Sequence, residues 1–176
     1  NDSRDGTAEM VAAEHPEVDL VESASNLGFA AATNLGAARG RADRLLVLNP
    51  DTAVTTGALD TVLAALDAHP EAALAGPRLL RPDGSLDHAA RRAFPTPVSA
   101  LGHFTGIGRR PRTGRLAAYR APDVESGPVD AVNGAFMLIR REAAADVGGL
   151  DERFWLYGED LDWCQRFGEK GWRTLY

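Results

Sequence analysis

The chain has 176 residues, of which 44% are hydrophobic, so it is long enough to bury a core and has the composition of a globular protein. Its formal net charge of −6 at pH 7 argues against binding to nucleic acid, which usually needs a basic surface. No apolar run approaches the length of a membrane span, residues 1–5 hold no apolar signal-peptide region, and the single cysteine, Cys164, excludes an internal disulfide. We therefore expect a protein of a reducing, cytoplasmic compartment.

Helical and strand patterns alternate through the first half of the chain. The patterns predict helices over 7–14 with Thr7 as the cap, over 29–39 closed by Gly40, and over 56–69 capped by Thr55 or Thr56. They predict strands over 18–21, 44–48 and 72–75, of which 44–48 is a continuous apolar run typical of a buried strand. Helices placed between strands imply right-handed crossovers and a mostly parallel sheet flanked by helices, an α/β fold.

The second half is less regular. A turn is expected over 81–84, a strand over 135–139, a helix over 141–147 ended by Gly148, a last helix from Glu159 to Gly171 and a strand beginning at 172. The stretch between Phe94 and Pro128 is locally basic, with arginines at 109, 110, 112, 115 and 120. It is most simply a solvated loop. The alternative is contact with the diphosphate of a lipid-linked acceptor or with an anionic membrane surface.

Both ends of the sequence are unusual for this class of fold. Doubly wound α/β domains usually open with a buried strand, whereas this chain opens on a turn and stops inside an apparent strand. The pattern predicts one domain over 1–176 that is a piece of a longer polypeptide, truncated at both ends.

A carboxylate follows the predicted strand 44–48, in the sequence Asn49-Pro50-Asp51. Taken alone, this is an ordinary turn sequence. The functional interpretation is a site for Mg²⁺ or Mn²⁺, because these ions prefer oxygen ligands and are often held by one or two carboxylates together with substrate phosphates. Ligands of open α/β folds bind at such strand ends.

A second acidic pair, Glu159-Asp160, lies at the predicted start of the last helix. Acidic residues in a first helical turn are favoured by the helix dipole, which is the simpler explanation. The residues before them, including Trp155 and Tyr157, form an aromatic cluster of the kind that lines sugar sites, and a carboxylate beside it could act as a general base.

The order of these motifs resembles the family-2 glycosyltransferases of the GT-A fold, most closely the bacterial rhamnosyltransferase-like branch. The blocks that carry the resemblance are 1–7, Asn26–Ala30 with Asn34, Leu48–Asp51, Arg81–Ser85, Ala90–Pro95, Asn133–Arg141, Gly149–Phe154 and Tyr157–Cys164. They cover nearly the whole chain. The family's first strand, the acidic residue expected directly before Asn1 and a histidine expected beyond Tyr176 are absent. The Gln-x-x-Arg-Trp motif of processive enzymes is absent too, which favours addition of a single sugar.

The resemblance implies roles for individual residues. Catalysis would fall to Asp160, with Glu159 beside it, and the metal to Asp51. The resemblance implies that the nucleotide-sugar is bound by Asn1, Asn26, Gly28, Asn34, Asn49 and Asp51. It implies that the donor sugar or the acceptor is contacted by Asn133, Gly134, Trp155 and Tyr157.

The sequence thus predicts an inverting, metal-dependent glycosyltransferase of cell-envelope polysaccharide synthesis. The resemblance implies a dTDP- or UDP-linked sugar donor, rhamnose being one, and a saccharide or polyprenyl-diphosphate-linked acceptor, with peripheral contact at the inner face of the plasma membrane left open. Two alternatives also stay open. One is a nucleotidyltransferase, although no basic, glycine-rich phosphate loop occurs early in the chain; the other is a non-catalytic carbohydrate-binding or scaffold domain of the same fold.

Overall fold

A computed structural model describes residues 1–94 and 125–176. The arginine-rich stretch 109–120 and Pro95 of the predicted motif 90–95 lie outside the described residues. The described chain forms two compact units, one comprising 1–41 with 150–159 and the other 42–149 with 160–176. Within the described residues, no helix is long and apolar enough to cross a membrane.

The first unit contains two helices, α1 (Thr7–Glu14) and α2 (Phe29–Arg39). Both helices were predicted at these positions, but Thr7, which was predicted to cap α1, is its first residue. Gly6 precedes the helix with a φ of 86°, and the Thr7 hydroxyl donates a hydrogen bond to the Asp5 carboxylate instead. The strand predicted over 18–21 was wrong, because that segment has no strand to pair with among the described residues.

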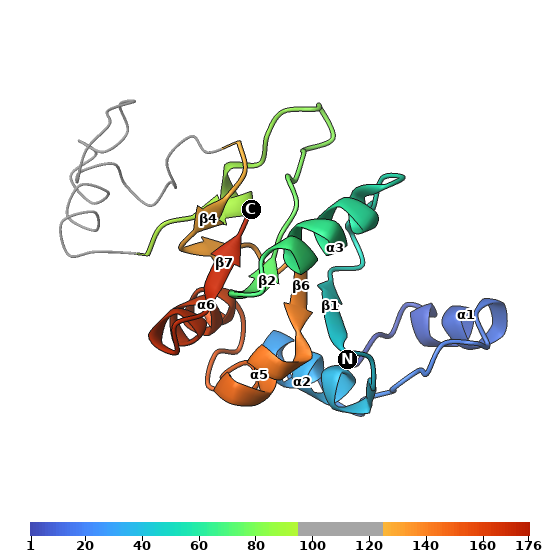
Figure 1. The fold of residues 1–176 in the computed structure, drawn as a ribbon. Coiled ribbons are helices and arrows are strands. Elements are labelled where there is room, and N and C mark those ends of the chain that lie inside the picture. The colour runs from blue at the N-terminus through green and yellow to red at the C-terminus, as the bar shows by residue number, and fades with distance from the viewer. Residues whose placement is uncertain (95–124) are drawn as a thin grey trace, which may run out of the picture. The chain divides into compact units, whose positions relative to one another are not determined.

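The second unit is built on a five-stranded sheet with the order β1-β6-β2-β7-β4 (Figure 1). The strands are β1 (Arg44–Leu48), β2 (Ala72–Ala75), β4 (Pro128–Val129), β6 (Phe136–Arg140) and β7 (Arg173–Leu175). A separate short ladder joins β3 (Arg91–Arg92) to β5 (Ala131–Val132).

The α/β class and the helix-flanked sheet are confirmed, but the pairing is mixed. β1, β2 and β7 run in the same direction, as the predicted crossovers require. However, β6 lies between β1 and β2 and is antiparallel to both, so β2–β7 is the parallel pairing of this sheet. The expectation of mostly parallel pairing was therefore wrong, because β6 enters the sheet from the irregular second half of the chain.

Helices cover both faces of this sheet. On one face, α3 (Ala58–Ala68) packs Val62 and Leu66 against Phe136 and Leu138 of β6. On the other, α6 (Glu159–Glu169) brings Cys164 into hydrogen-bond contact with Thr174 of β7. The sheet is thus the middle layer of this unit.

Two local predictions need correction. α3 begins at Ala58 after Gly57, which has a φ of 78°, so neither Thr55 nor Thr56 caps it. The predicted buried strand 44–48 is instead an edge strand, and its Leu46 and Leu48 remain 38% and 41% exposed. An apolar run indicates that the side chains of a strand can be buried. The position of the strand in the sheet determines which of these side chains are covered by other residues.

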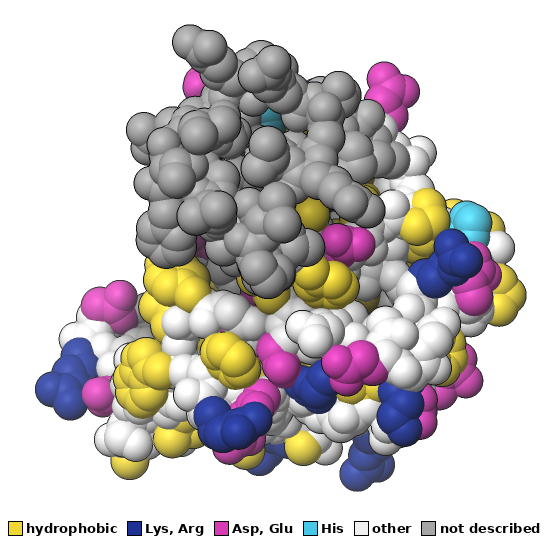
Figure 2. All heavy atoms as spheres, turned by 90° about the vertical axis from the view of Figure 1, so that its left-hand side faces the viewer, with side chains coloured by type: hydrophobic (Ala, Val, Ile, Leu, Met, Phe, Trp, Pro, Cys, Tyr) yellow, Lys and Arg dark blue, Asp and Glu magenta, His cyan; other side chains and the backbone are white. Residues whose placement is uncertain are grey.

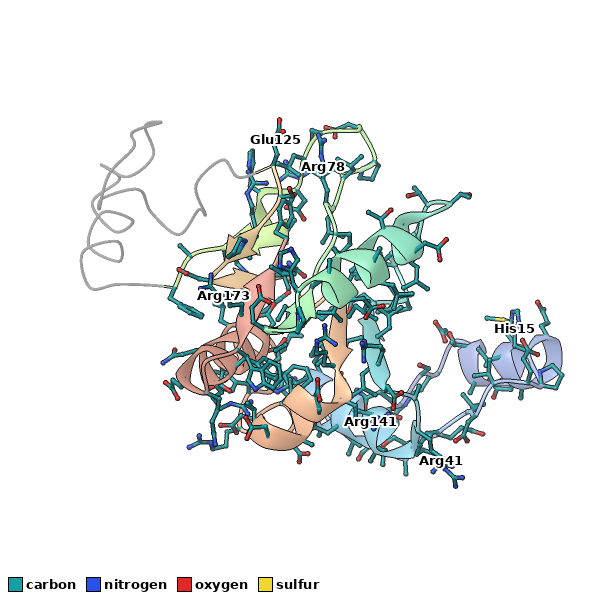
Figure 3. The ribbon with its side chains drawn as sticks, viewed as in Figure 1. His15, Arg41, Arg78, Glu125, Arg141 and Arg173 are labelled. Carbon is teal, nitrogen blue, oxygen red and sulfur yellow. The ribbon has the colours of Figure 1, made fainter. Side chains whose placement is uncertain are left out.

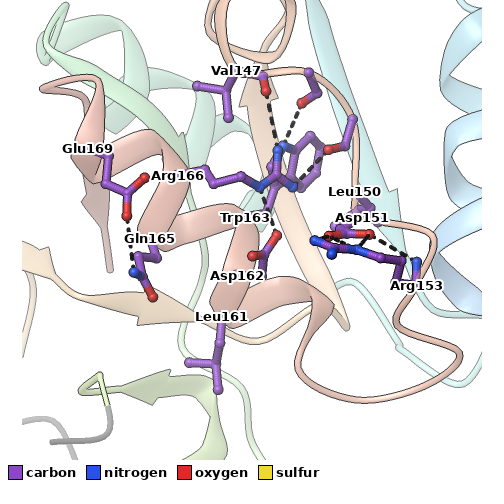
Figure 4. A network of polar contacts seen from close by, with 12 residues as sticks. Val147, Leu150, Asp151, Arg153, Leu161, Asp162, Trp163, Gln165, Arg166 and Glu169 are labelled. Carbon is purple, nitrogen blue, oxygen red and sulfur yellow. Dashed lines mark hydrogen bonds and ion pairs between the residues drawn. The ribbon is translucent and has the colours of Figure 1, made fainter.

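α6 is also fastened to the end of α5 (Arg141–Val147). The Arg166 guanidinium donates to the carbonyl oxygens of Val147 and Gly149 at 3.3 and 2.8 Å, and to the Asp162 carboxylate at 2.7 Å (Figure 4). The Trp163 indole donates to the Gly148 carbonyl at 2.8 Å. These donors satisfy carbonyl groups that the end of a helix leaves unpaired.

Arg140 at the end of β6 ties the end of α3 to β2. Its Nε donates to the Ala72 carbonyl at 2.8 Å, and its Nη2 donates to the carbonyl oxygens of Leu66 and His69. The Arg140 side chain is buried, so these hydrogen bonds are largely shielded from water.

We expect Arg140→Met to lower the free energy of unfolding by about 2 kcal/mol, because the carbonyl groups of Ala72, Leu66 and His69 each lose a hydrogen bond from a buried guanidinium. Urea unfolding followed by circular dichroism measures this. Arg173→Ala is the control: Arg173 is exposed on β7 (Figure 3), and its loss should change stability by no more than about 0.5 kcal/mol. Equal stability of the two variants would contradict the role given to Arg140.

Candidate active site

The predicted metal residue lies on a turn directly after β1. The Asn49 amide donates to the Ala135 carbonyl at 2.9 Å, and the Thr52 amide closes the turn on the Asn49 carbonyl at 3.1 Å. Asp51 is exposed, and its carboxylate makes no hydrogen bond or ion pair with any part of the chain that the structure describes. This carboxylate is therefore free to bind a ligand.

The predicted base lies in a different environment. Asp160 is the second residue of α6 and is 6% exposed. Its Oδ2 accepts a hydrogen bond from the Gly134 amide at 2.9 Å and forms an ion pair with Arg92, while its Oδ1 accepts from the Leu161 amide at 2.8 Å. Glu159, beside it, is also buried.

A short turn between β5 and β6 joins these two acidic segments. Asn133 stabilises the turn. Its side-chain oxygen accepts a hydrogen bond from the Ala135 backbone amide at 2.8 Å, and its backbone amide donates to the Ala90 carbonyl at 3.2 Å. The Ala135 carbonyl accepts the hydrogen bond from the Asn49 backbone amide, and the Gly134 backbone amide donates to Asp160. The structure thus connects Asn49, Asn133, Gly134 and Asp160 through one turn, and Asp51 lies two residues after Asn49.

Other predicted residues meet in the first unit. The Asn1 side chain donates to the Asn26 side chain at 3.1 Å and to the Gly28 carbonyl at 3.2 Å, and it accepts from the Leu27 amide at 2.7 Å. A small pocket of about 240 Å³ opens here, lined by Asn1, Asn26, Gly28, Phe29, Trp155 and Leu156.

Gly28 is needed for this pocket. Its φ is 80°, and a Cβ atom at this position would lie 2.7 Å from the Trp155 carbonyl oxygen, which accepts the Phe29 amide at 3.0 Å. A larger residue would therefore push the Trp155 backbone away.

Asn34 and Tyr157 differ from simple lining residues. The Asn34 side chain both accepts from the Leu150 amide at 2.9 Å and donates to the Leu150 carbonyl at 2.8 Å, so it holds the start of the segment 150–158. Within that segment Tyr157 is 82% exposed and has a φ of 70°, a strained conformation for an aromatic residue. Trp155 is also exposed.

A divalent metal fits Asp51 only if the substrate supplies most of its ligands. The described residues hold no group of three or more His, Cys, Asp or Glu side chains arranged to bind a metal. One unpartnered carboxylate at a strand end suits Mg²⁺ or Mn²⁺, since such ions commonly keep few protein ligands and complete their shell with phosphates and water.

Residues 1–148 match the family described as Glycosyl transferase family 2. The chain belongs to this family. It is 35% identical, over all of its length, to the N-acetylglucosaminyl-diphospho-decaprenol L-rhamnosyltransferase of Mycobacterium tuberculosis, of which it spans 61%. It is also 30% identical to the pre-mycofactocin glycosyltransferase of Mycobacterium tuberculosis, with 92% of this chain and 31% of that protein aligned. The chain is also 27% identical to the low-salt glycan biosynthesis hexosyltransferase Agl10 of Haloferax volcanii, with 86% of this chain and 47% of that protein aligned.

One residue of this family-2 domain was missed by the reasoning from sequence. Arg92 was included in a motif but was given no role, and the structure places it on Asp160. A usable signal existed for Asp160. Trp163, Cys164 and Phe167 form the buried stripe of α6, and the helical period extends this stripe back to residue 160. A carboxylate on a buried stripe needs a hydrogen-bonded or oppositely charged partner, and the arginines of the sequence motifs are candidates for this partner.

The same stripe holds the single cysteine. Burial raises the pKa of the Cys164 thiol from 9.0 to about 11, against smaller opposing effects of hydrogen bonds that the sulfur accepts from Val132 and Thr174. The thiol is therefore protonated in the folded protein at physiological pH and is not a reactive nucleophile.

This shift predicts a pH dependence of stability. The thiol ionises more readily in the unfolded chain, so its contribution to stability is complete below about pH 9 and is lost as the pH rises through about 11. The loss amounts to about 2 to 3 kcal/mol. We expect the Tm of the wild-type protein to fall more steeply than that of Cys164→Ala between about pH 8 and pH 10.5. Parallel Tm curves would show that the burial of this thiol does not raise its pKa.

Proposed function

We propose that the protein containing this chain is an inverting, metal-dependent glycosyltransferase. It would move a sugar from a nucleotide-diphospho-sugar to a hydroxyl group of a saccharide or lipid-linked acceptor in cell-envelope polysaccharide synthesis. The observation that carries the proposal is the turn Asn133–Ala135, which holds the Asp51 segment on one side and Asp160 on the other. The names of the relatives from Mycobacterium tuberculosis and Haloferax volcanii support sugar transfer, and that of the rhamnosyltransferase supports rhamnose as the donor sugar.

In the proposed reaction Asp160 is the general base. The acceptor hydroxyl oxygen attacks the anomeric carbon while its proton passes to the Asp160 carboxylate. The bond from the anomeric carbon to the phosphate oxygen breaks, and its electron pair leaves with the nucleoside diphosphate. Attack opposite to the leaving group inverts the anomeric configuration. Glu159, the neighbouring buried acid, is proposed to support this site.

Asp51 would hold Mg²⁺ or Mn²⁺ together with the diphosphate of the donor, with Asn49 beside it. When bound, the metal would neutralise the charge that develops on the departing diphosphate. The exposure of Asp51 and its lack of a partner in the described chain support this role.

Separate roles are proposed for residues of the first unit. Asn1, Asn26 and Gly28 would bind the nucleotide of a dTDP- or UDP-linked donor, since all three line one small pocket. Asn34 would support this side by holding the segment that carries the exposed Trp155 and Tyr157. These two aromatic residues would contact the acceptor, because exposed aromatic rings suit the apolar faces of sugars.

The proposed location is the cytoplasm, with peripheral contact at the inner face of the plasma membrane. The lone cysteine supports the compartment. Membrane contact would rest on the basic stretch 109–120. On the face in Figure 2, acidic and basic side chains of the described residues are interspersed.

Asp160→Asn in the full-length protein should lower turnover about a hundredfold or more, because the amide cannot accept the proton. Affinity for the nucleotide-sugar, measured by calorimetry, should remain. Near-normal turnover in this variant would remove Asp160 from the role of base.

Asp51→Ala should weaken binding of the nucleotide-sugar in the presence of Mn²⁺ by about tenfold or more, since the metal loses its protein ligand. Calorimetric titrations with and without Mn²⁺ separate the outcomes. Metal-independent binding in both the wild-type protein and the variant would favour a non-catalytic carbohydrate-binding domain. Turnover of a nucleoside triphosphate with a sugar phosphate would favour a nucleotidyltransferase.

A further inference from the structure

Arg92 is held on the short strand β3, where it pairs with Ala131 of β5. Its side chain is 15% exposed. The Nη2 group donates to the Asp160 carboxylate and to the Val132 carbonyl, the latter at 3.3 Å, while the buried Nε has no partner in the described part of the chain. The guanidinium is thus fixed by one nitrogen that lies between the strand backbone and the carboxylate.

The two oxygens of Asp160 are used unequally. Oδ2 accepts from both Arg92 and the Gly134 amide, whereas among the described residues Oδ1 accepts from the Leu161 amide alone. A carboxylate oxygen offers about two acceptor positions. Oδ2 is therefore fully occupied, and Oδ1 has one acceptor position left.

We propose that Arg92 is the positioning residue of the base: by occupying Oδ2 together with Gly134, it makes Oδ1 the oxygen that takes the proton from the acceptor hydroxyl. This inference rests on the proposed function. Arg92 need not touch either substrate. It fixes the rotation of the carboxylate about the Cβ–Cγ bond, so that the open position of Oδ1 keeps one direction.

The neighbouring arginine shows that the position of Arg92 is specific. Arg91 places its guanidinium over the ring of Tyr176, with 4.8 Å between the guanidinium carbon and the ring centroid. Successive residues of a strand point to opposite sides, so these adjacent arginines cannot replace each other. A lysine at position 92 would keep the charge but lose the planar guanidinium that carries Nη2 to both acceptors.

The test compares Arg92→Met and Arg92→Lys with the wild-type protein in the full-length enzyme, by steady-state kinetics with donor and acceptor. For Arg92→Met we expect kcat to fall about tenfold to a hundredfold, the size expected for a misplaced catalytic group, while the KM for the donor stays within about threefold. Arg92→Lys should recover part of kcat. Arg78→Met is the matched control, because Arg78 is exposed on the segment after β2 (Figure 3) and has no side-chain partner among the described residues.

A double variant separates positioning from a structural role. If Arg92 acts through Asp160, then Arg92→Met should change the residual kcat of Asp160→Asn by less than about twofold, since the group it positions is already lost. Circular dichroism and Tm identify any variant that fails to fold, in which case Arg92→Lys carries the comparison.

The proposal is overturned if Arg92→Met keeps the wild-type kcat, if it raises the donor KM and leaves kcat unchanged, or if its effect is undiminished in the Asp160→Asn background. Failure of the proposed function would look different, because the wild-type protein itself would then transfer no sugar.

Discussion

The second unit depends on the requirement that a buried carboxylate have hydrogen-bond donors for its charge. An unpaired charge inside a protein is costly, so Asp160 can occupy the buried stripe of α6 only if donors surround it. The donors come from three places: Arg92 on β3, the Gly134 amide before β6, and the Leu161 amide on α6 itself. These bonds join the first turn of α6 to two ladders of strands. The same interactions that satisfy the charge also set the orientation proposed for catalysis.

The two acids of the site are placed in opposite environments. Asp51 is exposed on a turn and has no partner in the described chain, which suits a ligand that exchanges with solvent and substrate. Asp160 is buried and held by three donors, which suits a group that must keep one direction. The turn Asn133–Ala135 holds both segments. Both residues are aspartates. Their different solvent exposure suits them to the two different proposed roles.

Much of the fold could be predicted from local patterns. Helical periodicity predicted α2 and α3 to within a few residues, and apolar runs predicted β1, β2 and β6. Pairing could not be predicted, because hydrogen bonds between strands depend on residues far apart in the sequence. For this reason 18–21 was wrongly predicted as a strand, β1 was wrongly predicted as buried, and the antiparallel insertion of β6 was not foreseen.

The sequence by itself determined the α/β class, the positions of most helices and strands, and the ordered motifs that indicated family 2. It also indicated two carboxylates as candidate site residues, since Asp51 follows a strand and Asp160 opens a helix. Only the tertiary structure decided that Arg92 pairs with Asp160 and that Asn34 holds Leu150. These partners are 68 and 116 residues apart. Such contacts leave no local periodicity, because they form only when separate elements pack together.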